Sequence, residues 1–236
     1  MTLLSVTDLH SHYGKSHILH GMSFTLAAGE MIALLGRNGS GRSTAMKAIM
    51  GLVPPTRGSI KLGANELVGL PSHKINRAGI AYVPEERLAF SNLTVEENLQ
   101  IGIAAPRPNA KTWSLEEMYG FFPRLRERRN VRAGSISGGE QQMLTLCRSL
   151  LGQPAVILID EPTEGLAPKI VEHLADVMRD INRQGVASVL VEQKMTIALK
   201  LCSRCLIMGH GAIVFEGTPE ELLATPSVRR EWLEVA

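Results

Sequence analysis

Residues 31–44, "MIALLGRNGSGRST", predict the fold of this chain, because they join a buried strand to a helix through a glycine-rich loop. Met31–Leu35 is an apolar run without alternation, which is typical of a strand buried on both faces of a parallel sheet. A helix is expected to follow and to end before Pro54 and Pro55. Its expected apolar stripe is Ala45, Ala48, Ile49 and Leu52.

The loop "GRNGSGRST", residues 36–44, nearly matches the phosphate-binding P-loop, in which a lysine stands where this chain has Arg42. Glycines permit tight turns and close backbone approach, so that N–H groups at a helix N-terminus can surround a phosphate. Ser43 is expected to ligate Mg²⁺ as well. The alternative is an ordinary glycine-rich turn before a helix. The expected phosphate-binding residues are Gly36, Asn38, Gly39, Ser40, Gly41, Arg42, Ser43 and Thr44.

The composition is that of an ordinary globular protein of 236 residues, with 44% hydrophobic residues and a formal net charge of +2. This small charge does not indicate nucleic acid as a partner. No apolar run has the length of a membrane span and no signal peptide is recognisable, so we expect a cytoplasmic protein. Cys202 and Cys205 form "CSRC" without a second pair, which does not favour a zinc or redox site.

Four of the seven histidines lie in residues 10–20, "HSHYGKSHILH". Metal binding is not favoured there, because no carboxylate or cysteine joins them in the sequence and the region resembles a pair of strands. The next residues support strands, since Met22, Phe24 and Leu26 alternate with polar residues at the period of a half-buried antiparallel strand.

A second glycine motif begins the segment "ISGGEQQMLTLCRSLL". Ser137 and Glu140 have the spacing of a capping box, which marks a helix N-terminus. Ser137, Gly138 and Gly139 leave backbone N–H groups accessible and can hold an anion there, although a well-capped helix alone also explains them. The expected apolar face of this helix is Met143, Leu146, Cys147, Leu150 and Leu151.

The segment "AVILIDEPTEGLAP" leads the apolar strand Val156–Ile159 into Asp160 and Glu161. Carboxylates at the C-terminal end of a parallel strand lie where such sheets bind ligands. Asp160 suits a Mg²⁺ ligand, and Glu161 suits a general base that activates water. An amphipathic helix ending near Gly185 and the buried strand "VASVLV" follow, which favours an α/β parallel sheet. The expected inward residues of that helix are Ile170, Leu174, Val177, Met178 and Ile181.

Taken in this order, the motifs resemble the ATP-binding subunits of ABC transporters over essentially the whole chain. "ISGGE" resembles the family's signature, and "YVPEER", "NLTVEENL", "EPTEGLAP", "LVEQ" and "FEGTPEELL" most resemble the ATPases of branched-chain amino-acid importers. Urea and short-chain amide importers are close relatives. The resemblance implies one P-loop NTPase (ABC ATPase) domain with an antiparallel β subdomain and an inserted helical subdomain. Its expected parts are a nucleotide-binding core, 1–87 and 151–236, and a helical subdomain with the signature, 88–150.

The resemblance also implies roles for single residues. Tyr13 would stack on adenine, although a loop aromatic that shields a strand edge is the alternative. Residues 36–44 would hold the phosphates, with Asp160 and Glu161 in the roles given above. Ser137, Gly138 and Gly139 would contact the γ-phosphate of a nucleotide bound by another subunit, so that two chains complete each site.

Three residues depart from the wider family. Glu85 stands where glutamine is usual and adds negative charge near Mg²⁺, so it is expected near the metal. Gln193 stands where a switch histidine is usual and cannot carry a proton. Ala167 stands where aspartate is common. These departures put the sensing of the γ-phosphate in question.

We therefore expect a subunit that binds MgATP, closes as a pair and hydrolyses ATP. A groove near Glu85 and residues 88–150 is expected to engage transmembrane permease subunits on the inner face of the membrane. The second ATPase can be identical or a paralogue, and a periplasmic or extracellular solute-binding protein takes part indirectly. "APRPNAK", Ala105–Lys111, is expected to be a surface loop. The alternatives are a regulatory module with little hydrolysis, favoured by Arg42, and a soluble P-loop kinase, which "ISGGE" disfavours.

Overall fold

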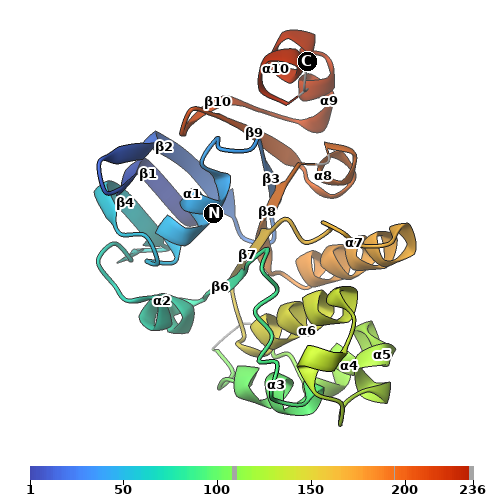
Figure 1. Cartoon of the computed structure of the whole chain (residues 1–236). Helices are drawn as coiled ribbons and strands as arrows, with labels where there is room; N and C mark the ends of the chain where they lie inside the picture. The colour runs from blue at the N-terminus through green and yellow to red at the C-terminus, as the bar shows by residue number, and fades with distance from the viewer. Residues whose placement is uncertain (108–110, 194, 234–236) are drawn as a thin grey trace.

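The computed structural model describes residues 1–107, 111–193 and 195–233. Its first sheet is antiparallel, has the strand order β2-β1-β4-β5 and lies on one side of the molecule (Figure 1). Met22, Phe24 and Leu26 are buried on the inner face of this sheet, which confirms the predicted half-buried strand. The strands are β1 (Thr2–Tyr13), β2 (Ser16–Ala27), β4 (Pro55–Leu62) and β5 (Asn65–Glu66).

The second sheet has the order β10-β9-β3-β8-β7-β6. Neighbouring strands are parallel from β9 to β6, and β10 pairs antiparallel with β9. Every residue of β3, β7 and β8 is buried, so the three predicted apolar strands are confirmed. The strands are β3 (Met31–Leu35), β6 (Ile80–Val83), β7 (Val156–Asp160), β8 (Ala187–Glu192), β9 (Arg204–Gly209) and β10 (Ala212–Gly217).

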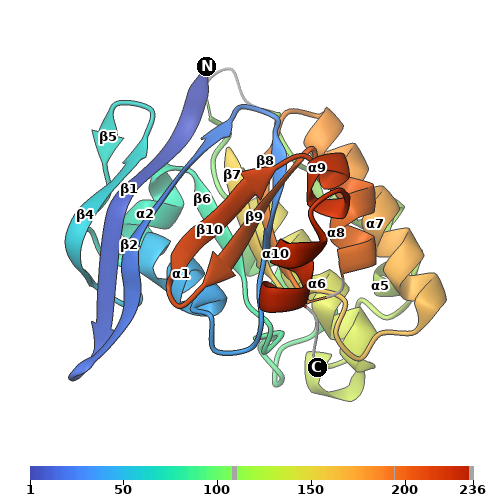
Figure 2. The same ribbon diagram turned by 90° about the horizontal axis from the view of Figure 1, so that it is seen from above.

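Helices cover both faces of the parallel sheet. Figure 2 shows α1 between the two sheets, and α6 and α7 on the opposite side of the parallel strands. The helices α3 to α6 gather beyond the sheet in a layer of their own (Figure 1). The α-helices are α1 (Arg42–Ile49), α2 (Ser72–Ala78), α3 (Val95–Gly102), α4 (Leu115–Phe121), α5 (Pro123–Glu127), α6 (Gly138–Leu151), α7 (Pro168–Arg183), α8 (Met195–Leu201), α9 (Pro219–Leu223) and α10 (Pro226–Trp232), and Ala133–Ser135 is a 3₁₀ turn.

Two hydrophobic cores explain why the parallel strands lack alternation. Ile32 and Leu34 of β3 face the core that contains α1 and the antiparallel sheet. Ala33 and Leu35 face the core that contains α6 and α7. Because both sides of the strand are covered, apolar residues occupy every position, and the predicted α/β fold is confirmed.

The helix after the glycine loop is shorter than predicted. It ends at Ile49, because Gly51 takes a left-handed conformation with φ 67°. Leu52 is 53% exposed, so its predicted place on the buried stripe is wrong. Met46, which is fully buried, completes the stripe instead.

In the two longer predicted helices, the set of buried residues differs slightly from the predicted set. All five predicted residues of α6 are buried, but Gln142, Leu144 and Thr145 are buried as well, because the helix packs against β6 of the sheet and also against α3 and α5. In α7, four of the five predicted residues are buried, while Ile170 in the first turn is only partly buried against the core.

Among the helices of the described residues, four begin with a complete capping box. Ser137 and Glu140 form the one predicted at α6, where each side chain bonds the other residue's backbone N–H. The others pair Thr94 with Glu97, Ser114 with Glu117 and Thr218 with Glu221. Each box satisfies two of the N–H groups that a helix start leaves without partners.

The division of the chain into residues 1–87, 88–150 and 151–236 remains a prediction, although α3 to α6 all begin after residue 88. Ala105–Arg107 has no regular secondary structure, and the rest of the predicted loop, residues 108–110, lies outside the described residues. Among the described residues, no helix has the length and apolarity needed to cross a membrane.

Candidate functional site

The glycine-rich loop connects β3 to α1 at the C-terminal edge of the parallel sheet. A side chain at Gly36 would place its Cβ 2.5 Å from the carbonyl oxygen of Met208, so only glycine fits there. Gly41, directly before α1, has φ 102°, a conformation that glycine adopts without strain. The backbone therefore turns sharply and presents the N-terminus of α1 to the space above the sheet.

A pocket of about 400 Å³ lies on this loop. It contains all the predicted phosphate-binding residues of the loop except Gly36, together with three predicted residues from other segments: Glu85, Glu161 and Gln193. Its lining residues are Ile18, Asn38, Gly39, Ser40, Gly41, Arg42, Ser43, Thr44, Glu85, Glu161, Glu164 and Gln193. The volume lies in the range of small-ligand sites.

Two features of this pocket fit a phosphate group. The N-terminus of α1 points into it, where backbone N–H groups and the helix dipole favour an anion. The hydroxyl oxygen of Ser40 is buried and has no hydrogen-bond partner among the described residues. Because a buried hydroxyl without a partner is costly, a phosphate oxygen beside it would satisfy this donor.

Arg42 is 5% exposed, and its guanidinium donates hydrogen bonds to other residues of the chain. One nitrogen, Nη1, lies 2.9 Å from the carbonyl oxygen of Glu192. The other, Nη2, lies 3.1 Å from the Asn38 side-chain oxygen and 2.9 Å from Oε1 of Glu161. The guanidinium therefore forms a nearly buried ion pair with the predicted general base.

Glu161 lies directly after β7, and its side chain is 9% exposed. Its φ of 44° is unusual for a residue with a side chain and indicates local backbone strain at this position. Burial raises the pKa of its carboxyl, Arg42 lowers it, and Glu164 and Asp160 raise it again, with a raised pKa as the result. Gln193 also contacts this carboxylate, at 3.5 Å from Oε1, and bonds the Asn38 side chain as well.

Asp160, which is 1% exposed, lies beside Ser43, the other residue of the predicted magnesium site. The Ser43 hydroxyl lies 3.3 Å from Oδ1, and the Tyr82 hydroxyl donates to Oδ2 at 3.1 Å. Burial, followed by the charge of Asp160, raises the pKa of Tyr82, so this phenol stays a donor. A hydroxyl and a carboxylate are oxygen ligands of the kind that Mg²⁺ prefers, so these residues fit the ion.

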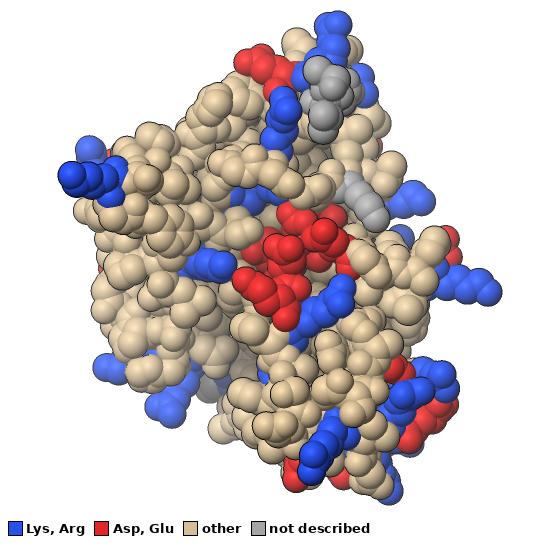
Figure 3. All heavy atoms as spheres, viewed as in Figure 1, with Lys and Arg blue, Asp and Glu red and all other residues tan. Residues whose placement is uncertain are grey.

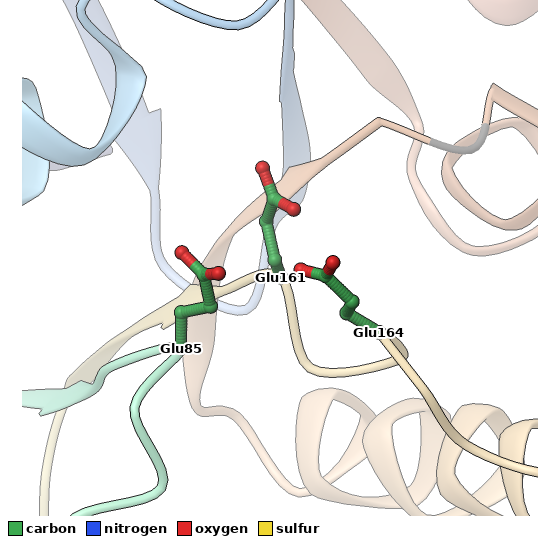
Figure 4. A group of neighbouring side chains, drawn as sticks. All are labelled: Glu85, Glu161 and Glu164. Carbon is green, nitrogen blue, oxygen red and sulfur yellow. The ribbon is translucent and has the colours of Figure 1, made fainter.

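Three carboxylates meet at the mouth of the pocket. One oxygen each of Glu85, Glu161 and Glu164 lies within 4.8 Å of the other two, and no other three metal-ligating side chains among the described residues converge in this way. Figure 4 shows that Glu85 follows β6 while the other two follow β7, and Figure 3 shows the acidic patch at the centre of this face. Burial, and then Glu161 and Glu164, raise the pKa of Glu85.

Five of the predicted cofactor-binding residues lie outside this pocket. Tyr13 is 50% exposed at the end of β1, and Ile18 of β2 lines the pocket instead. Gly36 lines a neighbouring hollow with Asn38 and Gln193. Ser137, Gly138 and Gly139 lie at the start of α6, where the Ser137 hydroxyl is engaged with Glu140.

Sequence reasoning did not assign Ile18, Tyr82 or Glu164 to the site. Tyr82 lies in the strand β6 beside β7, one residue before the strand ends, so only the sheet order brings its hydroxyl to Asp160. Glu164 follows Glu161 by three residues within "EPTEGLAP". This spacing is the signal by which the second carboxylate of the turn could have been assigned to the site.

The glycine loop, the Asp160–Glu161 strand end and the capped α6 have the arrangement expected from the motifs, and comparison with known proteins gives it a family. A family model described as "ABC transporter" matches residues 19–164. The chain belongs to the ABC transporter family. Within this family, the chain corresponds to the ATP-binding subunits. The predicted family is therefore confirmed.

This ABC ATPase is similar to curated relatives along nearly its whole length. It is 42% identical to the high-affinity branched-chain amino acid transport ATP-binding protein BraG of Pseudomonas aeruginosa, over 98% of this chain and 99% of that protein. It is 34% identical to the probable branched-chain amino acid transport ATP-binding protein LivF of Archaeoglobus fulgidus, over 94% of each chain. It is 30% identical to the lipopolysaccharide export system ATP-binding protein LptB of Haemophilus influenzae, over 99% of this chain and 98% of that protein.

Solved structures support the same fold. A nucleotide-free ATP-binding cassette of an ABC transporter matches with a TM-score of 0.84 at 24% identity, over 96% of each chain. An ATP-binding subunit of an ABC transporter matches with a TM-score of 0.80 at 29% identity, over 96% of this chain and 94% of that chain. The ABC ATPase fold is thereby confirmed.

As a member of this family, the chain is a nucleotide-binding ATPase coupled to transport and works with transmembrane permease components. The comparisons give no support to the alternative of a regulatory module with little hydrolysis. They include both amino-acid transport and lipopolysaccharide export proteins, so the family alone does not fix the direction or the solute.

Proposed function

We propose that this subunit binds and hydrolyses MgATP to energise the import of branched-chain amino acids. The observation that carries the chemistry is the single pocket in which the glycine loop, Arg42 and Glu161 meet. The observation that supports the solute is the 42% identity to BraG along nearly the whole of both chains.

The loop residues bind the triphosphate. Backbone N–H groups at the start of α1 donate to phosphate oxygens, and the Ser40 hydroxyl gains the partner that it lacks among the described residues. Arg42 keeps a positive charge beside the phosphates and can bond them with two nitrogens. Three carboxylates at the pocket mouth repel a bare triphosphate, so the neutralised MgATP complex is the form that fits.

Ser43, Asp160 and Glu85 would hold Mg²⁺, which when bound neutralises charge on the phosphates. Tyr82 keeps Asp160 in place through its hydrogen bond of 3.1 Å. Glu85 lies with Glu161 and Glu164 at the mouth of the pocket (Figure 4).

Glu161 accepts a proton from the attacking water. The raised pKa of this carboxyl, whose main cause is burial, brings it closer to neutral pH and makes it a better proton acceptor while it remains ionised. It can act only when Arg42 no longer occupies Oε1, at 2.9 Å. Gln193, which also contacts Glu161, takes part as a positioning residue because its amide cannot carry a proton.

A second ATPase subunit completes each site. Ser137, Gly138 and Gly139 lie outside the pocket of their own chain, which supports a role toward the nucleotide of another subunit. The adenine would reach the exposed ring of Tyr13 at the edge of the same face.

The surface between Glu85 and the helical layer contacts the permease, at the inner face of the membrane. Leu88, Phe90, Ile101 and Ile103 are each more than half exposed, which is unusual for apolar side chains and supports a binding surface. The buried Asn98 side chain bonds the backbone N–H and carbonyl of Phe90 at 2.9 and 3.0 Å and so fixes this loop. A solute-binding protein acts on the permease and not on this chain.

The test is uptake by the complex reconstituted with the permease and solute-binding proteins encoded beside it. We expect ATP-dependent uptake of leucine, isoleucine and valine, with no uptake for the Glu161→Gln variant. Uptake of urea or a short-chain amide in place of these amino acids would contradict the proposed solute, and outward movement of a solute would contradict import.

A further inference from the structure

The outer face of β1 and β2 carries a cluster of four histidines that the nucleotide site does not use. His10 is the cross-strand partner of His20, and His12 is the partner of His17. Ser11 and Leu19, which pair between them, are fully buried on the inner face. His10 and His12 are two residues apart on β1 and share its outer face, and a register shift between Ser11 and His12 brings His17 opposite His12, so the four imidazoles lie together. We call these four residues the histidine cluster.

His17 is the centre of the histidine cluster. Its ring centroid lies 5.2 Å from that of His10, 4.1 Å from that of His12 and 3.9 Å from that of His20. The nearest pair of nitrogens is Nδ1 of His10 and Nε2 of His17, 3.1 Å apart. Two nitrogens bound to one tetrahedral zinc ion at about 2.0–2.1 Å are roughly 3.3 Å from each other, so this pair is already at the spacing of two ligands.

A carboxylate joins the histidine cluster from the same strand. Asp8 Oδ1 lies 3.0 Å from Nε2 of His10, and Oδ2 of Asp8 lies 2.9 Å from Nε of Arg57 on β4. A carboxylate that accepts the Nε2 proton of His10 leaves the lone pair on Nδ1, toward His17. This carboxylate–histidine arrangement is the one that orients and strengthens histidine ligands in metal sites. The expectation that no carboxylate joins these histidines is therefore wrong, because the strand geometry supplies Asp8.

His12 and His20 are the remaining candidate ligands, and in the structure as it stands no three imidazole nitrogens of the histidine cluster converge. His12 is held through Nδ1 by the Thr56 hydroxyl at 3.1 Å, which leaves its Nε2 available. The side chain of His20 is exposed and can rotate. In the structure the rings of His12 and His17 stack within 5° of parallel, so the ligands converge only after one of these side chains rotates about its side-chain bonds.

We propose that His10, His12, His17 and His20 form a binding site for a divalent late transition-metal ion. Zn²⁺ is the ion that they bind, and Asp8 is the residue that orients His10. Imidazole nitrogens select zinc, copper and nickel over magnesium, whereas the carboxylate cluster of the nucleotide site offers only oxygens. The three cysteines are buried and do not compete for the metal.

The test is calorimetric titration of the untagged protein with Zn²⁺ in the absence of nucleotide and in the presence of excess Mg²⁺. Mg²⁺ occupies oxygen sites and leaves imidazoles free, so the result does not depend on the ATPase activity. We expect one equivalent of Zn²⁺ to bind. The variants His17→Ala and, at an exposed position, His20→Ala should weaken binding at least about tenfold, and Asp8→Asn should weaken it about 10- to 100-fold.

His73→Ala is the matched control, since His73 is exposed on α2 and outside the histidine cluster. It should bind Zn²⁺ as the wild type does. The proposal is overturned if the wild type shows no saturable binding, if Mg²⁺ displaces the zinc, or if the His17→Ala and His20→Ala variants bind Zn²⁺ with unchanged affinity.

Discussion

Arg42 shows how one substitution changes the resting state of a phosphate loop. A lysine carries a compact point charge, whereas the planar guanidinium has nitrogens that point in different directions. In this structure those nitrogens bond Glu192, Asn38 and Glu161, which lie on three different segments. In the function that we propose, the γ-phosphate therefore competes with the Glu161 carboxylate for the Arg42 guanidinium.

We predict that Arg42→Lys raises the turnover of ATP at least about tenfold. Losing one well-directed charged hydrogen bond to phosphate costs about 1.5–3 kcal/mol. This cost corresponds to roughly 10- to 150-fold in affinity or rate. The measurement is steady-state phosphate release by both forms with the permease present. Arg37→Lys, at an exposed residue of the same loop, is the control and should leave the rate unchanged. An equal or lower rate in the Arg42→Lys form would show that the loop has adapted to arginine.

At the scale of single elements, the helix N-termini combine structural and functional roles. The start of α6 carries the same capping box as α3, α4 and α9, yet only α6 has two glycines directly after the cap. The box accounts for the position of the helix start. The two glycines leave its N–H groups accessible to a ligand, which capping alone does not require.

We expect Ser137→Arg to abolish hydrolysis while the monomer keeps nearly the wild-type affinity for ATP, because Ser137 lies outside the pocket of its own chain. Nucleotide binding to dilute monomer and hydrolysis by the assembled complex are the two measurements. Ser114→Arg, which breaks the equivalent box of α4, controls for lost capping and should keep hydrolysis. A similar loss of affinity in the monomeric Ser137→Arg variant would place Ser137 in the site of its own subunit.

The capping box of α3 gives a prediction on stability. Thr94→Ala removes the acceptor of the Glu97 N–H, and it should lower the free energy of unfolding by about 1 kcal/mol. Urea unfolding measures this change. Ser72→Ala, in the first turn of α2, is the control because no side chain caps that helix. An unchanged unfolding midpoint for Thr94→Ala would mean that the hydrogen bonds of this box contribute nothing to stability.

At the scale of the whole molecule, the pocket is open and the parts of the predicted composite site lie on different surfaces. The phosphate loop and Glu161 belong to the pocket, and Ser137 at the start of α6 does not. Closure of two chains around the nucleotide brings these surfaces together in our proposal. The charge at the pocket mouth opposes closure around a bare triphosphate, because three carboxylates already meet there.

Glu161→Gln should bind MgATP and accumulate as an ATP-bound dimer. The substitution removes the proton acceptor and one negative charge from the pocket, while the loop contacts to phosphate remain. Light scattering with MgATP measures the dimer. Glu172→Gln, at an exposed residue of α7, is the control and should behave as the wild type does. A Glu161→Gln variant that binds nucleotide without becoming more dimeric than the wild type would contradict this role.

The sequence alone determined the features that depend on neighbouring residues. The apolar run of β3, the capping box of α6 and the glycine loop are local patterns, and the structure contains each of them where it was predicted. Local patterns failed where a single glycine decided the outcome, as at Gly51, which ends α1 before Leu52.

Only the tertiary structure decided which distant side chains meet. Arg42 and Glu161 are 119 residues apart, and Tyr82 and Asp160 are 78 apart, yet both pairs are in hydrogen-bond contact because their strands are neighbours or near neighbours in one sheet. The histidine cluster was visible as composition, but the meeting of His10 and His12 with His20 and His17 depends on the register between β1 and β2. The physical reason is that periodicity fixes the face on which a side chain lies, whereas strand order and register fix its neighbours across the sheet.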